Sequence, residues 1–195
     1  EKEVSTYSRE FWIFLGATTL CLMGFQVLIP TSIPVYNKII EIFGGISNLA
    51  PPANQIEFYS KFQLWFAVAV ACFSGVGQFF WWRKMDKEKV KKELIVPALI
   101  TLIVFALIIA VAKVYQPAYL ALTFAGVFII VSNLKVLQTV LKVNPKLSGG
   151  AIAHIGIGMM LIGIMFSAGY SRVVSLNNTG LIYIKEMGTE FNRDN

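Results

Sequence analysis

Five long apolar runs, separated by short polar segments, dominate the chain. A helix needs about 20 mostly apolar residues to cross the hydrocarbon core of a bilayer, and each run approaches or exceeds that length. The pattern therefore predicts an all-α polytopic membrane protein. The predicted spanning helices cover residues 11–29, 62–82, 94–115, 118–134 and 149–170.

Prolines and short connections set the expected path between these helices. Pro30 and Pro34 should stop the first helix, because proline lacks the backbone N–H and its ring crowds the preceding turn. The fourth helix should continue as a more polar helical end to about Lys142. The connections after the third and fourth helices are short, so we expect the last three helices to be antiparallel neighbours.

The longest connection contains a pattern of its own. In "VYNKIIEIF", helical spacing places four apolar residues on one face, which predicts a short helix on the outer surface. The four residues are Val35, Ile39, Ile42 and Phe43. The following "APPANQ" should break the helix and turn the chain back.

After the last span the pattern changes to strict alternation. In "LIYIKE" (181–186), which follows the turn signal "NNTG", successive side chains alternate in a way typical of a strand. We therefore expect a transmembrane helical domain over residues 1–175. Residues 176–195 should begin an extracytoplasmic, β-like segment.

Composition supports a membrane protein and argues against nucleic-acid binding. Hydrophobic residues make up 56% of the chain and charged residues 14%, whereas about a quarter of a soluble domain is charged. The net charge of +6 comes from basic residues between the apolar runs. That distribution is typical of topology signals and contacts with anionic lipids in the bilayer.

The same basic residues predict the orientation. A cytoplasmic N-terminus places 11 of the 17 Lys and Arg residues inside, most of them in "RKMDKEKVKK" (83–92). The C-terminus is then extracytoplasmic. Trp12, Trp81 and Trp82 fit an aromatic belt at the inner interface better than a ligand platform.

Most reactive residue types offer no motif. Cys21 and Cys72 lie in apolar runs without metal-ligand spacing, so we expect two small buried hydrophobes. Asp and Glu are nearly absent from the predicted spans, which leaves no candidates for a carboxylate proton relay. The chain starts without Met or a signal peptide, and we interpret it as part of a longer polypeptide.

One histidine stands out in the fifth run. Gly150, His154 and Gly158 are spaced four residues apart and share a helix face. The glycines leave room either for a neighbouring helix or for a flat ligand such as haem, with its iron at the imidazole. The chain has no second histidine, and Met159 and Met160 on the same helix cannot reach the opposite face of such a haem. Both alternatives stay open on the residues alone.

Five segments, in order, resemble the F component of bacterial cytochrome c maturation, a membrane haem lyase. "STYSREFWIFL" (5–15) resembles the family's "TFSRE" start of a helix, and "AHIGIGMMLIGIMFSAGYS" (153–171) resembles its "AHLGxAxxxxG" helix. "IPTSIPV" (29–35), "APPANQIEFY" (50–59) and "FFWWRK" (79–84) match its "GTxxPL", "GPPxFN" and "RW" segments more loosely.

The chain also departs from that family. Leu15 and Gly16 replace paired asparagines, and Pro30 replaces a glycine. The tryptophan-rich "WGxxWxWD" segment and its flanking histidines are absent. Since these features belong to the N-terminal half of such proteins, the chain resembles the C-terminal half, split or truncated.

The resemblance implies a function in the bacterial inner membrane. The family attaches haem to the CxxCH cysteines of apocytochrome c outside the membrane and holds a separate haem b within it. Carried over by position, His154 is an axial ligand of the haem b iron, with Gly150 and Gly158 giving space for the macrocycle. For Arg9 and Glu10, orienting the first helix is favoured over a contact with a haem propionate.

The implied partners follow from what the chain lacks. A missing half or separate subunit would carry the tryptophan-rich segment and the second axial histidine; apocytochrome c and a haem chaperone complete the set. The chain is not expected to be active alone. Two alternatives remain: a haem-free transporter or permease module, and a structural membrane subunit in which His154 only packs.

Overall fold

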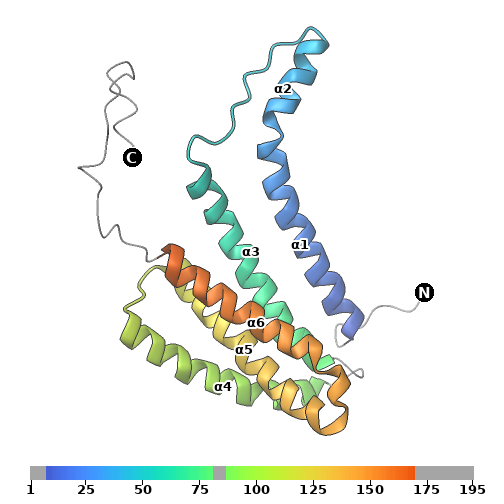
Figure 1. Cartoon of the computed structure of the whole chain (residues 1–195), viewed down its shortest axis with the longest axis vertical. Coiled ribbons are helices and arrows are strands. Elements are labelled where there is room, and N and C mark those ends of the chain that lie inside the picture. Colours follow the sequence, from blue (N-terminus) through green and yellow to red (C-terminus); the bar gives the residue numbers. More distant parts are fainter. Residues whose placement is uncertain (1–7, 81–86, 170–195) are drawn as a thin grey trace, which may run out of the picture.

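The computed structural model describes residues 8–80 and 87–169, and this part of the chain is helical without any strand (Figure 1). The long helices are α1 (Arg9–Thr31), α2 (Ile33–Ile42), α3 (Gln55–Gly77), α4 (Lys87–Ala112), α5 (Pro117–Val143) and α6 (Gly149–Ile164). Short turns η1 (Gln78–Phe80), η2 (Pro145–Leu147) and η3 (Met165–Gly169) extend three of them. The predicted β-like segment over 176–195, and Trp81 and Trp82, lie outside the described residues.

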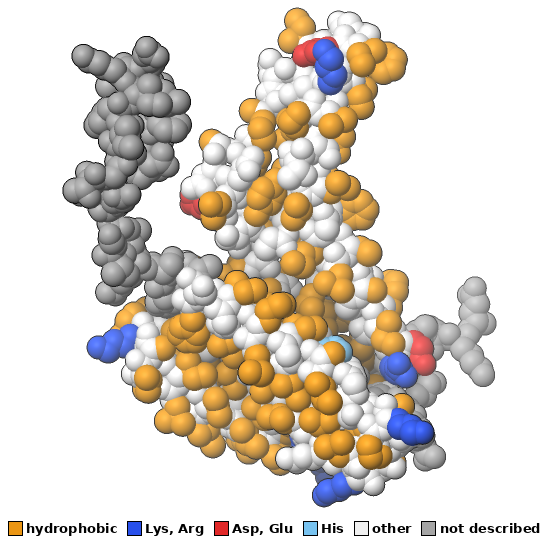
Figure 2. Space-filling model, viewed as in Figure 1, with side chains coloured by type: hydrophobic (Ala, Val, Ile, Leu, Met, Phe, Trp, Pro, Cys, Tyr) orange, Lys and Arg blue, Asp and Glu red, His pale blue; other side chains and the backbone are white. Residues whose placement is uncertain are grey.

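Five long helices correspond to the five predicted spans, although the third begins at Lys87 and ends at Ala112 and so does not reach residue 115. Within the described residues, five helices are long and apolar enough to cross a membrane: α1, α3 with η1, α4, α5, and α6 with its flanking turns. Figure 2 shows apolar side chains covering most of this face, with charged side chains near the ends of the helices. The predicted all-helical, multi-pass architecture therefore holds for this part of the chain.

Two predicted boundaries are corrected by local hydrogen bonds. Pro30 does not stop α1: the helix runs on to Thr31, whose hydroxyl donates to the carbonyls of Val27 and Leu28 at 2.8 and 3.0 Å. At the start of α3, the Asn54 side chain accepts from the Glu57 N–H at 3.1 Å and caps the helix. The helix therefore begins at Gln55, well before the apolar run.

Helix α5 is the centre of the molecule. Helices α3, α4 and α6 all pack against it, and α4, α5 and α6 are sequential neighbours, as predicted (Figure 1). Glycines permit two of these contacts. A Cβ on Gly75 of α3 would lie 2.6 Å from the Phe128 ring, and one on Gly158 of α6 would lie 2.7 Å from side-chain atoms of Ile129 and Ile130. These helices therefore approach more closely than bulkier residues would allow.

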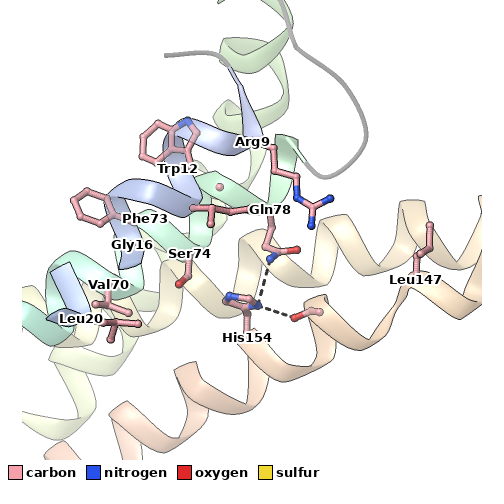
Figure 3. Close-up of a pocket in the computed structure, with 13 residues that line it drawn as sticks. Arg9, Trp12, Gly16, Leu20, Val70, Phe73, Ser74, Gln78, Leu147 and His154 are labelled. Atoms are coloured by element: carbon pink, nitrogen blue, oxygen red, sulfur yellow. Dashed lines mark hydrogen bonds between the residues drawn. The ribbon is translucent and has the colours of Figure 1, made fainter. Parts of the chain in front are cut away.

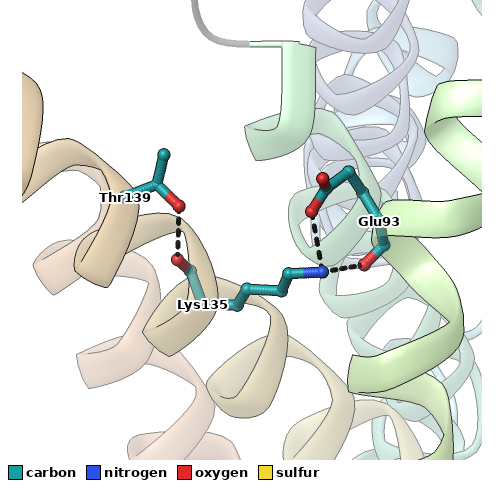
Figure 4. Close-up of polar contacts among 3 residues, drawn as sticks. All are labelled: Glu93, Lys135 and Thr139. Carbon is teal, nitrogen blue, oxygen red and sulfur yellow. Dashed lines mark hydrogen bonds and ion pairs between the residues drawn. The ribbon is translucent and has the colours of Figure 1, made fainter.

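A proline inside α4 is matched by a lysine on α5. Pro97 has no N–H, so the carbonyl of Glu93, four residues earlier, lacks its usual helical donor. Lys135 Nζ lies 2.7 Å from that carbonyl oxygen and 2.7 Å from the Glu93 carboxylate (Figure 4). One side chain thus satisfies the carbonyl freed by the proline and ties α4 to α5.

Helices α1 and α3 form an arm that leaves the layer of α4, α5 and α6, and α2 continues beyond α1 (Figure 1). The predicted short helix is thus present, and the four apolar residues predicted to share its face are 46–85% exposed. Asn37 donates to the Leu49 carbonyl at 2.9 Å and fastens the following loop to α2. Because α1 packs mainly on α3, Cys21 is exposed and not buried as we expected; Cys72 is half-buried.

Candidate functional site

A cavity of about 550 Å³ lies where the start of α1, the end of α3 and the start of α6 meet (Figure 3). Its walls are apolar and aromatic, with four polar side chains among them. The lining residues are Arg9, Trp12, Ile13, Gly16, Leu20, Val70, Phe73, Ser74, Gly77, Gln78, Leu147, Gly150 and His154. Figure 2 shows the single histidine at a hollow between the α1–α3 arm and α6.

The wall formed by α1 and α3 is built from stacked rings. The indole of Trp12 stacks on Phe80 with centroids 6.0 Å apart and an interplanar angle of 12°, and it also meets Phe73 at 6.1 Å. Gly77 allows this approach, since a Cβ there would lie 3.3 Å from Trp12 Cβ. Trp12, predicted to belong to an interfacial belt, therefore serves as a packed wall of the cavity as well.

His154 is half-buried at the α6 side of the cavity. Its Nδ1 lies 2.7 Å from the Gly150 carbonyl oxygen, one turn earlier in α6, and 3.4 Å from Gln78 Nε2. The shorter contact is with an oxygen that can only accept, so it favours a proton on Nδ1. Nε2 then carries a lone pair and has no hydrogen-bond partner within the described residues, as a metal-ligating nitrogen requires.

The two glycines predicted to make room for a macrocycle lie in different surroundings. Gly150 lines the cavity, and a Cβ placed there would lie 3.7 Å from Gln78 Oε1, with no other described atom outside its own helix backbone within 4 Å. Gly158 is buried against α5, where even a Cβ would lie 2.7 Å from side-chain atoms of Ile129 and Ile130. Its surroundings match the helix-packing alternative, whereas Gly150 lies at the cavity.

Sequence reasoning did not single out the rest of the site. Ser74 and Gln78 are isolated polar residues near the end of an apolar helix, and Gly16 was noted only as a departure from the resembled family. Arg9, for which a helix-orienting role was favoured, lines the cavity (Figure 3). The glutamine three residues before the tryptophan pair was the one available signal, since amides are costly in a bilayer unless partnered.

The residues present fit one side of a haem. The cavity volume falls within the range of about 300–1,000 Å³ typical of cofactor sites, and the lining offers an imidazole, a guanidinium and apolar walls. Among the described residues, the lining contains no methionine, tyrosine or second histidine. A second axial histidine would have to come from outside this sequence, because it contains one histidine.

These features define a multi-pass helical membrane protein with a histidine at an apolar cavity between three helices. The chain is 24% identical over 173 residues to the cytochrome c-type biogenesis protein CcmF of Escherichia coli (strain K12). The alignment covers 85% of this chain and 25% of CcmF, so the chain spans about a quarter of that relative's length. No protein-family model and no solved structure matches the chain.

Proposed function

We propose that this chain is a membrane subunit of a cytochrome c maturation machinery and that His154 contributes an axial ligand to a haem b held at the cavity. The observation that carries the proposal is the state of the imidazole: Nδ1 is engaged at 2.7 Å by the Gly150 carbonyl, and Nε2 is unpartnered within the described residues at an apolar cavity. The distant similarity to CcmF supports the assignment to this machinery.

Each residue of the cavity has a defined task in this proposal. His154 presents the Nε2 lone pair to iron, and the Gly150 carbonyl keeps Nδ1 protonated and the ring fixed. The Trp12 and Phe73 rings exclude water, and Arg9 at the rim offers a guanidinium to a haem propionate. When bound, the haem supplies one-electron redox chemistry.

The remaining parts of the machinery come from outside this chain. A second subunit, or the missing half of a longer protein, provides the other axial histidine and the tryptophan-rich segment, while apocytochrome c and a haem chaperone act as partners. The chain sits in a bacterial cytoplasmic membrane with its N-terminus inside, and alone it does not attach haem to apocytochrome c.

The test is a reduced-minus-oxidised absorption spectrum of the membrane complex purified through this chain. His154→Ala should abolish the b-type signal that depends on this chain. Ile152→Ala is the matched control, because Ile152 lies on the same helix with 54% of its surface exposed and should leave the signal unchanged. A b-type signal of equal intensity in His154→Ala would refute the proposal and favour a structural or transport role.

A further inference from the structure

The two contacts of His154 Nδ1 require opposite protonation states of that nitrogen. The Gly150 carbonyl at 2.7 Å can only accept, so it requires an N–H on Nδ1. The Gln78 amide nitrogen at 3.4 Å can only donate, so it requires a lone pair on the same atom. A neutral imidazole nitrogen cannot satisfy both partners, and one of the two contacts must be replaced by another arrangement.

The distances decide which contact holds. At 2.7 Å the Gly150 contact is a short, strong hydrogen bond, whereas 3.4 Å is at the long limit for the Gln78 contact. A lone pair on Nδ1 would face the carbonyl oxygen at that short distance and repel it. Nδ1 therefore carries the proton, and the glutamine is the group that must adapt.

A half-turn of the glutamine amide removes the conflict. The turn exchanges Nε2 and Oε1, which occupy nearly the same volume, without moving any other atom. Oε1 then faces Nδ1–H and shares it with the Gly150 carbonyl in a three-centre hydrogen bond. Both contacts become favourable in the same tautomer.

The fold holds Gln78 in this place. Gln78 begins η1, where α3 tightens into a short turn, and its own N–H donates to the Val76 carbonyl. The next two residues, Phe79 and Phe80, are 7% and 1% exposed and anchor the turn in the bundle. The Gln78 side chain therefore reaches α6 from a fixed position just after the end of α3 (Figure 3).

We propose that Gln78 is a positioning residue for His154: its side-chain carbonyl accepts from Nδ1–H together with Gly150 and holds the ring in the tautomer whose Nε2 can bind iron. The inference rests on the proposed function for its purpose, but the tautomer itself is a property of the chain without haem. Losing such an outer partner typically weakens metal binding about ten- to a hundredfold.

The chain permits a direct test, because His154 is its only histidine. Nitrogen-15 histidine labelling of the full chain in lipid nanodiscs, without haem, gives an NMR spectrum of this ring alone. We expect the proton on Nδ1. Gln78→Leu should lower the ratio of the Nδ1–H to the Nε2–H tautomer by about three- to tenfold, the effect of one hydrogen bond.

Two further variants make the result specific. Gln78→Glu should raise the ratio above that of the unsubstituted chain, since a carboxylate is the stronger acceptor, and a folding defect could not produce that change. Gln63→Leu is the matched control: Gln63 also lies on α3, but it donates to Gln26 Oε1 and the Met23 carbonyl and should leave the ratio unchanged.

The outcomes separate the two proposals. A proton on Nε2 in the unsubstituted chain, or an unchanged ratio in Gln78→Leu, overturns the role of Gln78 whether or not haem binds. Absence of a b-type spectrum from the assembled complex overturns the haem proposal and leaves the tautomer measurement standing.

Discussion

At the scale of single residues, the site depends on how one imidazole is satisfied inside an apolar helix. A polar group buried without partners is costly. A carbonyl oxygen has two lone pairs, so the Gly150 carbonyl can accept from the ring as well as from its helical N–H. The two residues are one helical turn apart, and His154 Nδ1 lies 2.7 Å from the Gly150 carbonyl oxygen. The arrangement is local, so it forms whenever α6 forms.

Removing the ring and replacing it chemically tests ligation at this scale. His154→Gly should eliminate the haem b signal of the complex, and added imidazole should restore a large part of it by entering the space left by the side chain. The measurement is an absorption titration with imidazole. A signal that stays absent at saturating imidazole would indicate that His154 supports the fold and does not bind iron.

The glycines of α6 should respond differently to a single methyl group. In Gly158→Ala the new Cβ would overlap Ile129 and Ile130 at 2.7 Å, so we expect destabilisation of about 1–3 kcal/mol. Gly156→Ala, whose new Cβ would have no described atom outside its own helix backbone within 4 Å, should stabilise the helix by about 0.5–1 kcal/mol. Unfolding midpoints in detergent measure both, and equal midpoints for the two variants would contradict the close α5–α6 contact.

At the scale of helices, the contact between α4 and α5 compensates a defect in α4. The Glu93 carbonyl, left without a donor by Pro97, is paired instead with Lys135 at 2.7 Å. The lysine is 28% exposed and the glutamate 46%, so the ion pair itself contributes little. The hydrogen bond to the carbonyl is the part that replaces a missing helical bond.

A double-mutant cycle isolates that hydrogen bond. Lys135→Met should destabilise the chain by about 1–3 kcal/mol, because it leaves the carbonyl unpaired. In a Pro97→Ala background, the new N–H can donate to Glu93 and the cost should fall by at least half. Unfolding in mixed micelles gives the four free energies, with Lys142→Met, exposed at the end of α5, as the control. Equal costs in both backgrounds would disprove the compensation.

The helices themselves could be predicted from the sequence, but their partners could not. Apolar length is a property of each run, so all five spans were found. Ile129 is buried between helices, whereas Ile103 is exposed on the outside of the bundle. Hydropathy cannot distinguish these two positions, since the interior of the bundle and the lipid around it are both apolar. The early start of α3 was missed because its first turns are polar and held by the Asn54 cap.

At the scale of the whole molecule, the cavity is a product of packing between elements distant in sequence. Residues of α1, α3 and α6 come together because α3 and α6 both pack against α5 and α1 packs against α3. His154 was identifiable from the sequence, as the only histidine of the chain, but its neighbours Gln78 and Trp12 were not. Gly158 had the same spacing as Gly150, yet packing gave it another role.

The predicted orientation makes the cavity open near the cytoplasmic side, since Arg9 and the α5–α6 connection lie at that end. A membrane-impermeant thiol reagent on intact cells tests it in a Cys21→Ala, Cys72→Ala background. Asn48→Cys, in the exposed loop after α2, should be labelled, whereas Lys146→Cys, exposed in η2, should react only after permeabilisation. The reverse labelling pattern would show that the chain has the opposite orientation in the membrane.

The most direct test of haem ligation uses the single histidine of the chain. This chain, labelled with nitrogen-15 histidine, is assembled with unlabelled partners, and the oxidised complex is studied by pulsed electron paramagnetic resonance. The account predicts a strong nitrogen-15 hyperfine coupling to the low-spin ferric haem, because the only labelled ring is bound to iron. A ferric haem signal with nitrogen-14 couplings alone would show that His154 is not its ligand and would contradict the central claim.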